Sequence, residues 1–336
     1  MWTWLSSGLW LGWAVGANVA ANIFATAFAS RMVPFATVVK LSALFVVLGG
    51  VINGPAAMDT LSRLGGLDSL PAAIIVALAS ALTITAMSAM RLPVSAAQTA
   101  VGALVGHQLL QQGKIAAPAQ LLLRMIAIAW ICAPMLSALT AFVLYKTTAQ
   151  LFRRVPMPLF LMDQWLRLGL LAAGCYGAWA FGGNNMANVV SFYVGLDLFP
   201  AVRVGPWVIS QARMLALFGG IAISLGIATY SRRIMLTVGR DLVRLDGVSA
   251  LIAILSQALV VDFLAHSWAL GSYTLPAIPI SVSQALVGAI VGLGLARGLQ
   301  TIKLKILGSI VIGWVVTPII SAAIVYLLLP FARWFA

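Results

Sequence analysis

Two short polar motifs stand out from an otherwise apolar sequence, and each occurs once in either half of the chain. The first motif is a pair of asparagines four residues apart, a spacing that places both side chains on one face of a helix. Glycine precedes both pairs, which predicts a break in the helix and a new N-terminus with free backbone N–H groups. The amide side chains of this motif are Asn18, Asn22, Asn184, Asn185 and Asn188.

The second motif is a proline followed by serine and, three residues after the serine, by glutamine. Serine suits the cap of a helix and proline suits its first turn, so Ser95 and Ser281 are predicted to begin helices. Four helix N-termini would then converge, and positive dipole ends with neutral donors suit a small anion. The polar side chains of this motif are Ser95, Gln98, Ser281, Ser283 and Gln284.

The composition indicates that these motifs lie in a membrane protein. Of 336 residues, 62% are hydrophobic and only 8% are charged, whereas soluble domains carry about 25% charged residues. The net charge of +13 is spread thinly between apolar runs rather than clustered on one face, which argues against a nucleic-acid partner. The chain has no glutamate, no metal-ligand spacing and no nucleophile motif, so we expect neither an enzyme nor a cofactor.

Apolar segments long enough to span a bilayer form two sets of five. We interpret residues 1–146 as a first transmembrane repeat, 147–164 as a cytoplasmic linker and 165–336 as a second repeat. The first set lies near 2–30, 34–54, 70–91, 93–112 and 118–146. The second set lies near 165–197, 206–230, 248–270, 279–297 and 304–332.

The two sets match in sequence, which indicates an internal duplication. The third and fourth segments of each half are joined closely, around Arg91-Leu92 and around Ile278. They therefore either both cross or form a re-entrant hairpin, which leaves an odd number of crossings per half. The prediction is an all-α polytopic membrane protein with inverted-topology repeats, broken helices and re-entrant hairpins. Basic residues concentrate on one predicted side, so both termini are expected on the non-cytoplasmic side of the cell membrane.

Helix packing is the competing interpretation of each motif taken alone. Asparagine and serine in membrane helices often bond a neighbouring helix, and glycines four apart allow close approach. Because both motifs recur in both halves, anion binding at mid-membrane is favoured. The glycines assigned to packing are Gly102, Gly106, Gly288 and Gly292.

At these residues the chain resembles the inorganic phosphate transporter (PiT) family, close to its sulfate permease branch. The family signatures read Gly-Ala-Asn-Asp-x-Ala-Asn and Pro-Val-Ser-Thr-Thr-His, and both have counterparts in each half. The resemblance covers nearly the whole chain, including a Trp-x3-Pro block at Trp130 and Trp314. It implies an inverted-repeat transporter of phosphate, or of sulfate in one branch, with Na⁺ or H⁺ coupling and often a homodimer. It also implies substrate-binding roles for the asparagines and serines that match the signatures.

The chain departs from the signatures at their ionisable positions. Val19 and Asn185 stand where the family has aspartate, and Ala96-Ala97-Gln98 and Val282-Ser283-Gln284 stand where it has Thr-Thr-His. A hard cation prefers anionic and hydroxyl oxygens, so Na⁺ coupling is doubtful. Sulfate carries no proton for an aspartate to accept, so a neutral site is predicted to favour sulfate over phosphate.

Asp262 is the candidate for proton coupling. His266 follows it by four residues, so the two share a helix face and could relay a proton. The competing interpretation is that Asp262 pairs with a stray cation or reaches an interface. For the whole protein, a secondary transporter of an inorganic oxyanion is the leading prediction. An Na⁺- or H⁺-coupled phosphate transporter and an anion channel are the alternatives.

Overall fold

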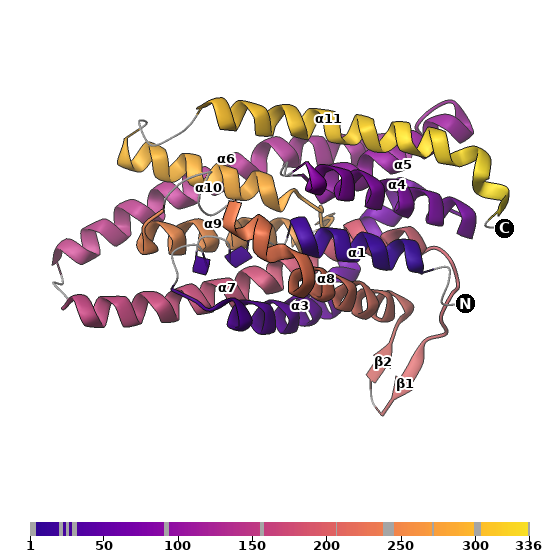
Figure 1. Ribbon diagram of the computed structural model, residues 1–336. Helices are drawn as coiled ribbons and strands as arrows, with labels where there is room; N and C mark the ends of the chain where they lie inside the picture. Colours follow the sequence, from indigo (N-terminus) through magenta and orange to yellow (C-terminus); the bar gives the residue numbers. More distant parts are fainter. Residues whose placement is uncertain are drawn as a thin grey trace.

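The computed structural model describes residues 5–19, 23–24, 27–28, 32–90, 94–154, 158–205, 207–237, 245–270, 272–298 and 304–334. These residues form a bundle of long helices that run roughly along one axis (Figure 1). The only described strands make two short antiparallel hairpins, β1 (Val202–Val204) with β2 (Trp207–Ile209) and β3 (Trp268–Leu270) with β4 (Tyr273–Leu275). The prediction of an all-α membrane protein is confirmed.

The helices follow the predicted apolar segments closely. The first half holds α1 (Ser6–Asn18), α3 (Phe35–Gly65), α4 (Leu70–Ala89), α5 (Ala96–Gln112) and α6 (Ala117–Arg154). The second half holds α7 (Leu159–Val190), α8 (Gln211–Thr237), α9 (Gly247–Ala265), α10 (Val282–Arg297) and α11 (Leu304–Leu328). Short 3-10 segments η1 (Ser191–Tyr193) and η4 (Leu329–Trp334) follow α7 and α11.

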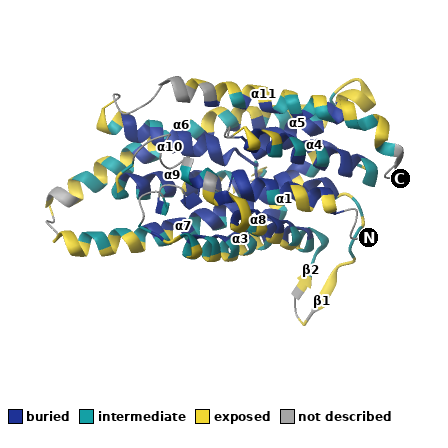
Figure 2. Cartoon of the chain, viewed as in Figure 1, coloured by how far each residue is buried: buried dark blue, intermediate teal, exposed yellow. Residues whose placement is uncertain are grey.

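The outer surface of the bundle suits lipid. Within the described residues, six helices are long and apolar enough to cross a membrane. The buried residues lie along the middle of the bundle, and exposed residues lie on its outside (Figure 2). Large apolar side chains are more than half exposed on α6 and α11, among them Ile131, Met135, Ile312 and Ile319. In water such surfaces would be a liability, whereas a bilayer solvates them.

The predicted linker is mostly helical. The interval 147–164 is occupied by the end of α6, which runs to Arg154, and by the start of α7 at Leu159. Of the residues between these two helices the structure describes only Pro158, since 155–157 are outside the described part. The two halves are therefore joined by a short connection between two long helices.

The helices of each half pack closely against helices of the other half. α1 packs on α8 and α3 packs on α7, while α5 packs on α11 and α10 packs on α6. Each pairing joins an element of one half to an element of the other. The inversion of one half relative to the other, the homodimer and the side on which the termini lie stay predictions.

Glycines make two of these pairings possible. A Cβ atom on Gly102 would lie 2.3 Å from the carbonyl oxygen of Pro318, and one on Gly288 would lie 2.2 Å from that of Pro134. One turn further on, Gly106 and Gly292 meet Ala322 and Ala138, again too closely for a Cβ atom to fit. The packing role predicted for these four glycines is confirmed.

The second helical hairpin differs from its prediction. A close connection was expected around Ile278, but residues 266–281 separate the end of α9 from the start of α10. The β3–β4 hairpin lies within this connection. The Ile278 N–H then donates to the carbonyl of Leu264, which returns the chain to the last turn of α9 before α10 begins.

Candidate functional site

The two serines of the second motif cap α5 and α10 in the same way. Ser95 Oγ accepts the backbone N–H of Gln98 at 3.3 Å, and Ser281 Oγ accepts that of Gln284 at 3.3 Å. Both serines have extended backbone and are almost completely buried. The predicted helix starts are confirmed at both positions, and each presents the free N–H groups of a first turn inside the bundle.

The two capped ends meet across the halves. Ser283, in the first turn of α10, donates its hydroxyl proton to the carbonyl of Val94 at 3.1 Å. Val94 immediately precedes the cap of α5, so this bond joins the start of one hairpin helix to the start of the other. The positive ends of α5 and α10 therefore lie close together in the protein interior.

Asn184 fixes the position of the second capped end. Its Nδ2 donates to the carbonyl of Ile280 at 2.9 Å, and its Oδ1 accepts the Ile280 N–H at 2.8 Å. Ile280 directly precedes the Ser281 cap, so α7 holds the non-helical backbone that leads into α10. These two bonds, which we call the Asn184–Ile280 clamp, occupy the acceptor of the amide. One N–H of Nδ2 is left for a ligand.

Asn185 and Asn188 form a smaller network on α7. Asn185 donates to the carbonyl of Phe181 at 3.1 Å, and Asn188 donates to Asn185 Oδ1 at 3.2 Å. Asn188 Oδ1 is buried and has no hydrogen-bond partner among the described residues. It is therefore an acceptor available to a ligand.

The predicted break before Asn184 is wrong. α7 is continuous from Leu159 to Val190 and passes through Gly182 and Gly183 without interruption. A Cβ atom on Gly182 would lie 2.2 Å from the carbonyl oxygen of Val46 on α3. This glycine therefore allows close helix contact rather than a new helix start.

The first asparagine pair is described in part. Asn18 is the last residue of α1, which runs through Gly16, so the expected break is also absent before Asn18. Its Nδ2 donates to Ser88 Oγ at 2.7 Å and thereby ties α1 to α4. Asn22, and any helix start beside it, lies outside the described residues. Two of the four predicted N-termini are thus confirmed, those of α5 and α10.

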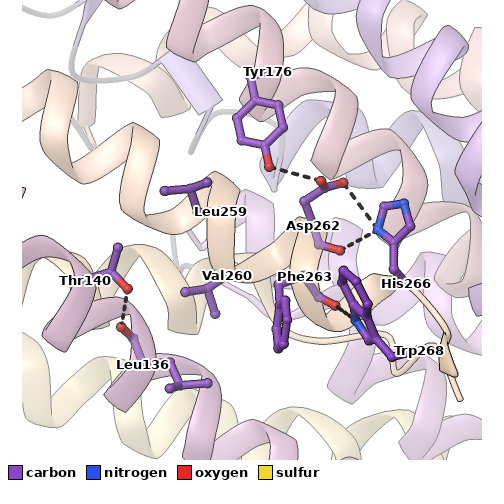
Figure 3. Close-up of a pocket in the computed structure, with 9 residues that line it drawn as sticks. All are labelled: Leu136, Thr140, Tyr176, Leu259, Val260, Asp262, Phe263, His266 and Trp268. Carbon is purple, nitrogen blue, oxygen red and sulfur yellow. Dashed lines mark hydrogen bonds and ion pairs between the residues drawn. The ribbon is translucent and has the colours of Figure 1, made fainter. Parts of the chain in front are cut away.

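Asp262 and His266 line a different cavity, of about 520 Å³, between α6, α7 and α9 (Figure 3). The hydroxyl of Tyr176 donates to Asp262 Oδ2 at 3.0 Å. His266 Nδ1 lies 2.7 Å from the backbone carbonyl of Asp262 and 3.6 Å from its Oδ1. The remaining walls are largely apolar, with Leu136, Leu259, Phe263 and Trp268 among them. Asp262 lies in the last turn of α9 and forms no ion pair with a described lysine or arginine.

This cavity is separate from the capped helix ends. Tyr176 and Asn184 are both on α7 and are eight residues apart, which corresponds to about 12 Å along the helix. Sequence reasoning missed Tyr176, because a tyrosine in an apolar segment has no motif around it. Its contact with Asp262 joins segments 86 residues apart, and only the fold reveals it.

Known proteins are similar to this chain in sequence and in fold. A protein of Methanocaldococcus jannaschii named "Putative phosphate permease" is 27% identical over 94% of this chain and 92% of its own length. A protein of Pyrococcus abyssi with the same description is 25% identical over 92% of both chains. A solved structure titled "The sodium-dependent phosphate transporter" shares the fold with a TM-score of 0.75, at 21% identity over 96% of this chain and 97% of that one.

The sequence also matches a family model over most of its length. The match to the model described as "Phosphate transporter family" covers residues 15–325. This range includes both asparagine motifs, both capped helix starts and the cavity of Asp262. The chain belongs to the phosphate transporter family.

Proposed function

We propose that this protein is a secondary transporter of inorganic phosphate, and that the anion binds where α5 and α10 begin. The observation that carries the proposal is the pair of buried serine caps joined by the bond from Ser283 to Val94. Two helix N-termini at one place supply backbone N–H donors and positive dipole ends without a charged side chain. Hydrogen bonds from neutral donors are weaker than those from charged groups, so an anion bound there can leave again.

Phosphate is favoured over sulfate by the available acceptor. Hydrogen phosphate carries a proton that it can donate, whereas sulfate is fully ionised at neutral pH and accepts only. Asn188 Oδ1 is a buried acceptor without a described partner, so it can accept a hydrogen bond from the P–OH group. The sequence comparison supports the same substrate, since the relatives are named as phosphate permeases. The sulfate preference predicted from the missing aspartates becomes the alternative that the uptake assay tests.

We further propose that a proton is the coupling ion and that Asp262 carries it. A carboxylate inside a membrane protein needs a cation or a proton, and Asp262 contacts only a tyrosine and a histidine within the described residues.

Uptake of radiolabelled phosphate into proteoliposomes tests the transport proposal. The expected result is saturable phosphate uptake that excess sulfate reduces little and that an inward proton gradient increases without Na⁺. Electrical currents far above the turnover of a carrier would instead indicate an anion channel. Sulfate uptake against which phosphate competes poorly would overturn the substrate assignment, and uptake that requires Na⁺ would overturn the coupling assignment.

The variant Asp262→Asn belongs in the same assay. It keeps the shape of the side chain and the acceptor for Tyr176 but cannot bind and release a proton. We expect uptake driven by a proton gradient to be lost, while exchange of labelled for unlabelled phosphate without a gradient persists. Asp59→Asn is the control, because Asp59 is exposed and pairs with Arg63 on the surface. Unchanged gradient dependence in Asp262→Asn would rule out Asp262 as the proton carrier.

A further inference from the structure

Two tryptophans, one buried and one partly buried, have buried indole N–H groups that the described structure leaves without an acceptor. They are Trp130 on α6 and Trp314 on α11, at equivalent positions of the two halves. The side-chain oxygens of Gln98 and Gln284, in the first turns of α5 and α10, are buried without a donor. A buried polar group without a partner is costly, so four such groups at equivalent positions need an explanation.

The close contacts between α5 and α11 place one tryptophan beside one glutamine. Gly102 meets Pro318, and Gly106 meets Ala322 one turn later on both helices. The two helices are therefore parallel and in step at this interface. One turn before Gly102 is Gln98, and one turn before Pro318 is Trp314. Because residues four apart share a helix face, these two side chains lie at the same level and both face the interface.

The same geometry recurs between α10 and α6. Gly288 meets Pro134, and Gly292 meets Ala138 one turn later. One turn before Gly288 is Gln284, and one turn before Pro134 is Trp130. Each glutamine therefore lies at the level of the tryptophan of the other half.

The prolines add a third polar group at each place. Proline has no backbone N–H, so Pro318 leaves the carbonyl of Trp314 without its helical donor, and Pro134 does the same to Trp130. Each place thus offers one N–H donor, the indole, and two acceptors, the tryptophan carbonyl and the glutamine oxygen. A water molecule accepts one bond and donates two, and buried waters typically make about three hydrogen bonds.

We infer that one ordered water at each place links Trp314 to Gln98 and Trp130 to Gln284, and that both tryptophans are positioning residues for the anion site. Bonding through Oε1 turns the Nε2 donors of each glutamine toward the start of its helix. This inference rests on the proposed function, since the anion is taken to bind there. It adds two residues that do not touch the anion but orient groups that do.

A double-mutant cycle tests this pairing. Trp314→Phe keeps the aromatic packing and removes the N–H, and Gln98→Leu removes the amide. We expect each single variant to raise the KM for phosphate about fivefold, the effect of one net hydrogen bond, with little change in kcat. In the Gln98→Leu background, Trp314→Phe should add nothing further. The crossed pair, Trp314→Phe with Gln284→Leu, is the matched control and should show additive effects.

The unfolding temperature of the purified protein is measured for the same variants. This second readout does not depend on transport. Coupling in the matched pair and additivity in the crossed pair support the inference, in both readouts. Additive effects in the matched pair would overturn it. Coupling in the unfolding temperature alone would overturn the positioning role, because the waters would then be only structural. Absence of phosphate uptake by the unmodified protein would instead refute the proposed function. The pairing of Trp314 with Gln98 would then be tested by the unfolding temperatures alone.

Discussion

Replacement of Asn184 by leucine is expected to reduce phosphate uptake strongly and to destabilise the fold. The substitution removes both bonds to the backbone of Ile280 and leaves a buried N–H and a buried carbonyl without partners. Each of the two orphaned groups costs about 1–3 kcal/mol, so the free energy of unfolding should fall by about 2–6 kcal/mol. The Ser281 cap follows Ile280 directly, so the start of α10 should shift and uptake should fall roughly tenfold or more. Tryptophan fluorescence during heating and proteoliposome uptake measure the two effects.

Two further variants show whether this effect belongs to the clamp. Asn53→Leu places the same side chain on α3 at a partly exposed position and should leave both measurements close to those of the unmodified protein. Asn184→Asp keeps an acceptor for the Ile280 N–H but sets a carboxylate oxygen against the Ile280 carbonyl, so it should resemble Asn184→Leu. If Asn184→Leu transports normally, the clamp does not position the anion site.

Replacement of Gly288 by valine is expected to separate α10 from α6. A Cβ atom at this position would lie 2.2 Å from the carbonyl oxygen of Pro134, which is backbone and cannot turn aside. Overpacking in a close interface typically costs about 1–3 kcal/mol and sometimes more, and here the helices must move apart. The displaced α10 would carry its capped N-terminus with it. The yield of folded protein, its unfolding temperature and its phosphate uptake should all fall.

Gly308→Val is the matched control. Gly308 is inside α11, and a Cβ atom there meets nothing within 4 Å. Valine is also a slightly better helix former than glycine, so this variant should fold and transport normally. If Gly288→Val behaves like Gly308→Val, the close contact with Pro134 is not needed for the fold.

The capped helix starts could be predicted from sequence because their chemistry is local. A serine cap bonds a backbone N–H three residues later, so proline, serine and glutamine in that order carry the information by themselves. The predicted membrane segments succeeded for a similar reason, since length and hydropathy are properties of one continuous stretch.

The helix breaks could not be predicted, because the glycines act on distant partners. Gly182 meets the Val46 carbonyl, and Gly16 meets the Ile223 carbonyl in the other half. A glycine that allows close contact and a glycine that ends a helix have the same local sequence. The partner of Asn184 was hidden for the same reason, since Ile280 is 96 residues away in the chain.

The β3–β4 hairpin was missed because its residues are apolar. Trp268, Leu270, Tyr273 and Leu275 extend the hydropathy of α9 and were included in the predicted segment 248–270 and the connection that follows it. Hydrophobic periodicity over three residues does not distinguish a strand from the end of a helix. The consequence for function is that Asp262 lies in the last turn of α9 rather than deep within a longer helix.

Phosphate is proposed to bind between the starts of α5 and α10, and a structure determined with phosphate present tests this placement most directly. The predicted result is a bound anion within hydrogen-bond distance of first-turn N–H groups of both helices, beside the Ser95 and Ser281 caps. A phosphate bound elsewhere in a protein that transports it, or bound in the cavity of Asp262, would contradict the account.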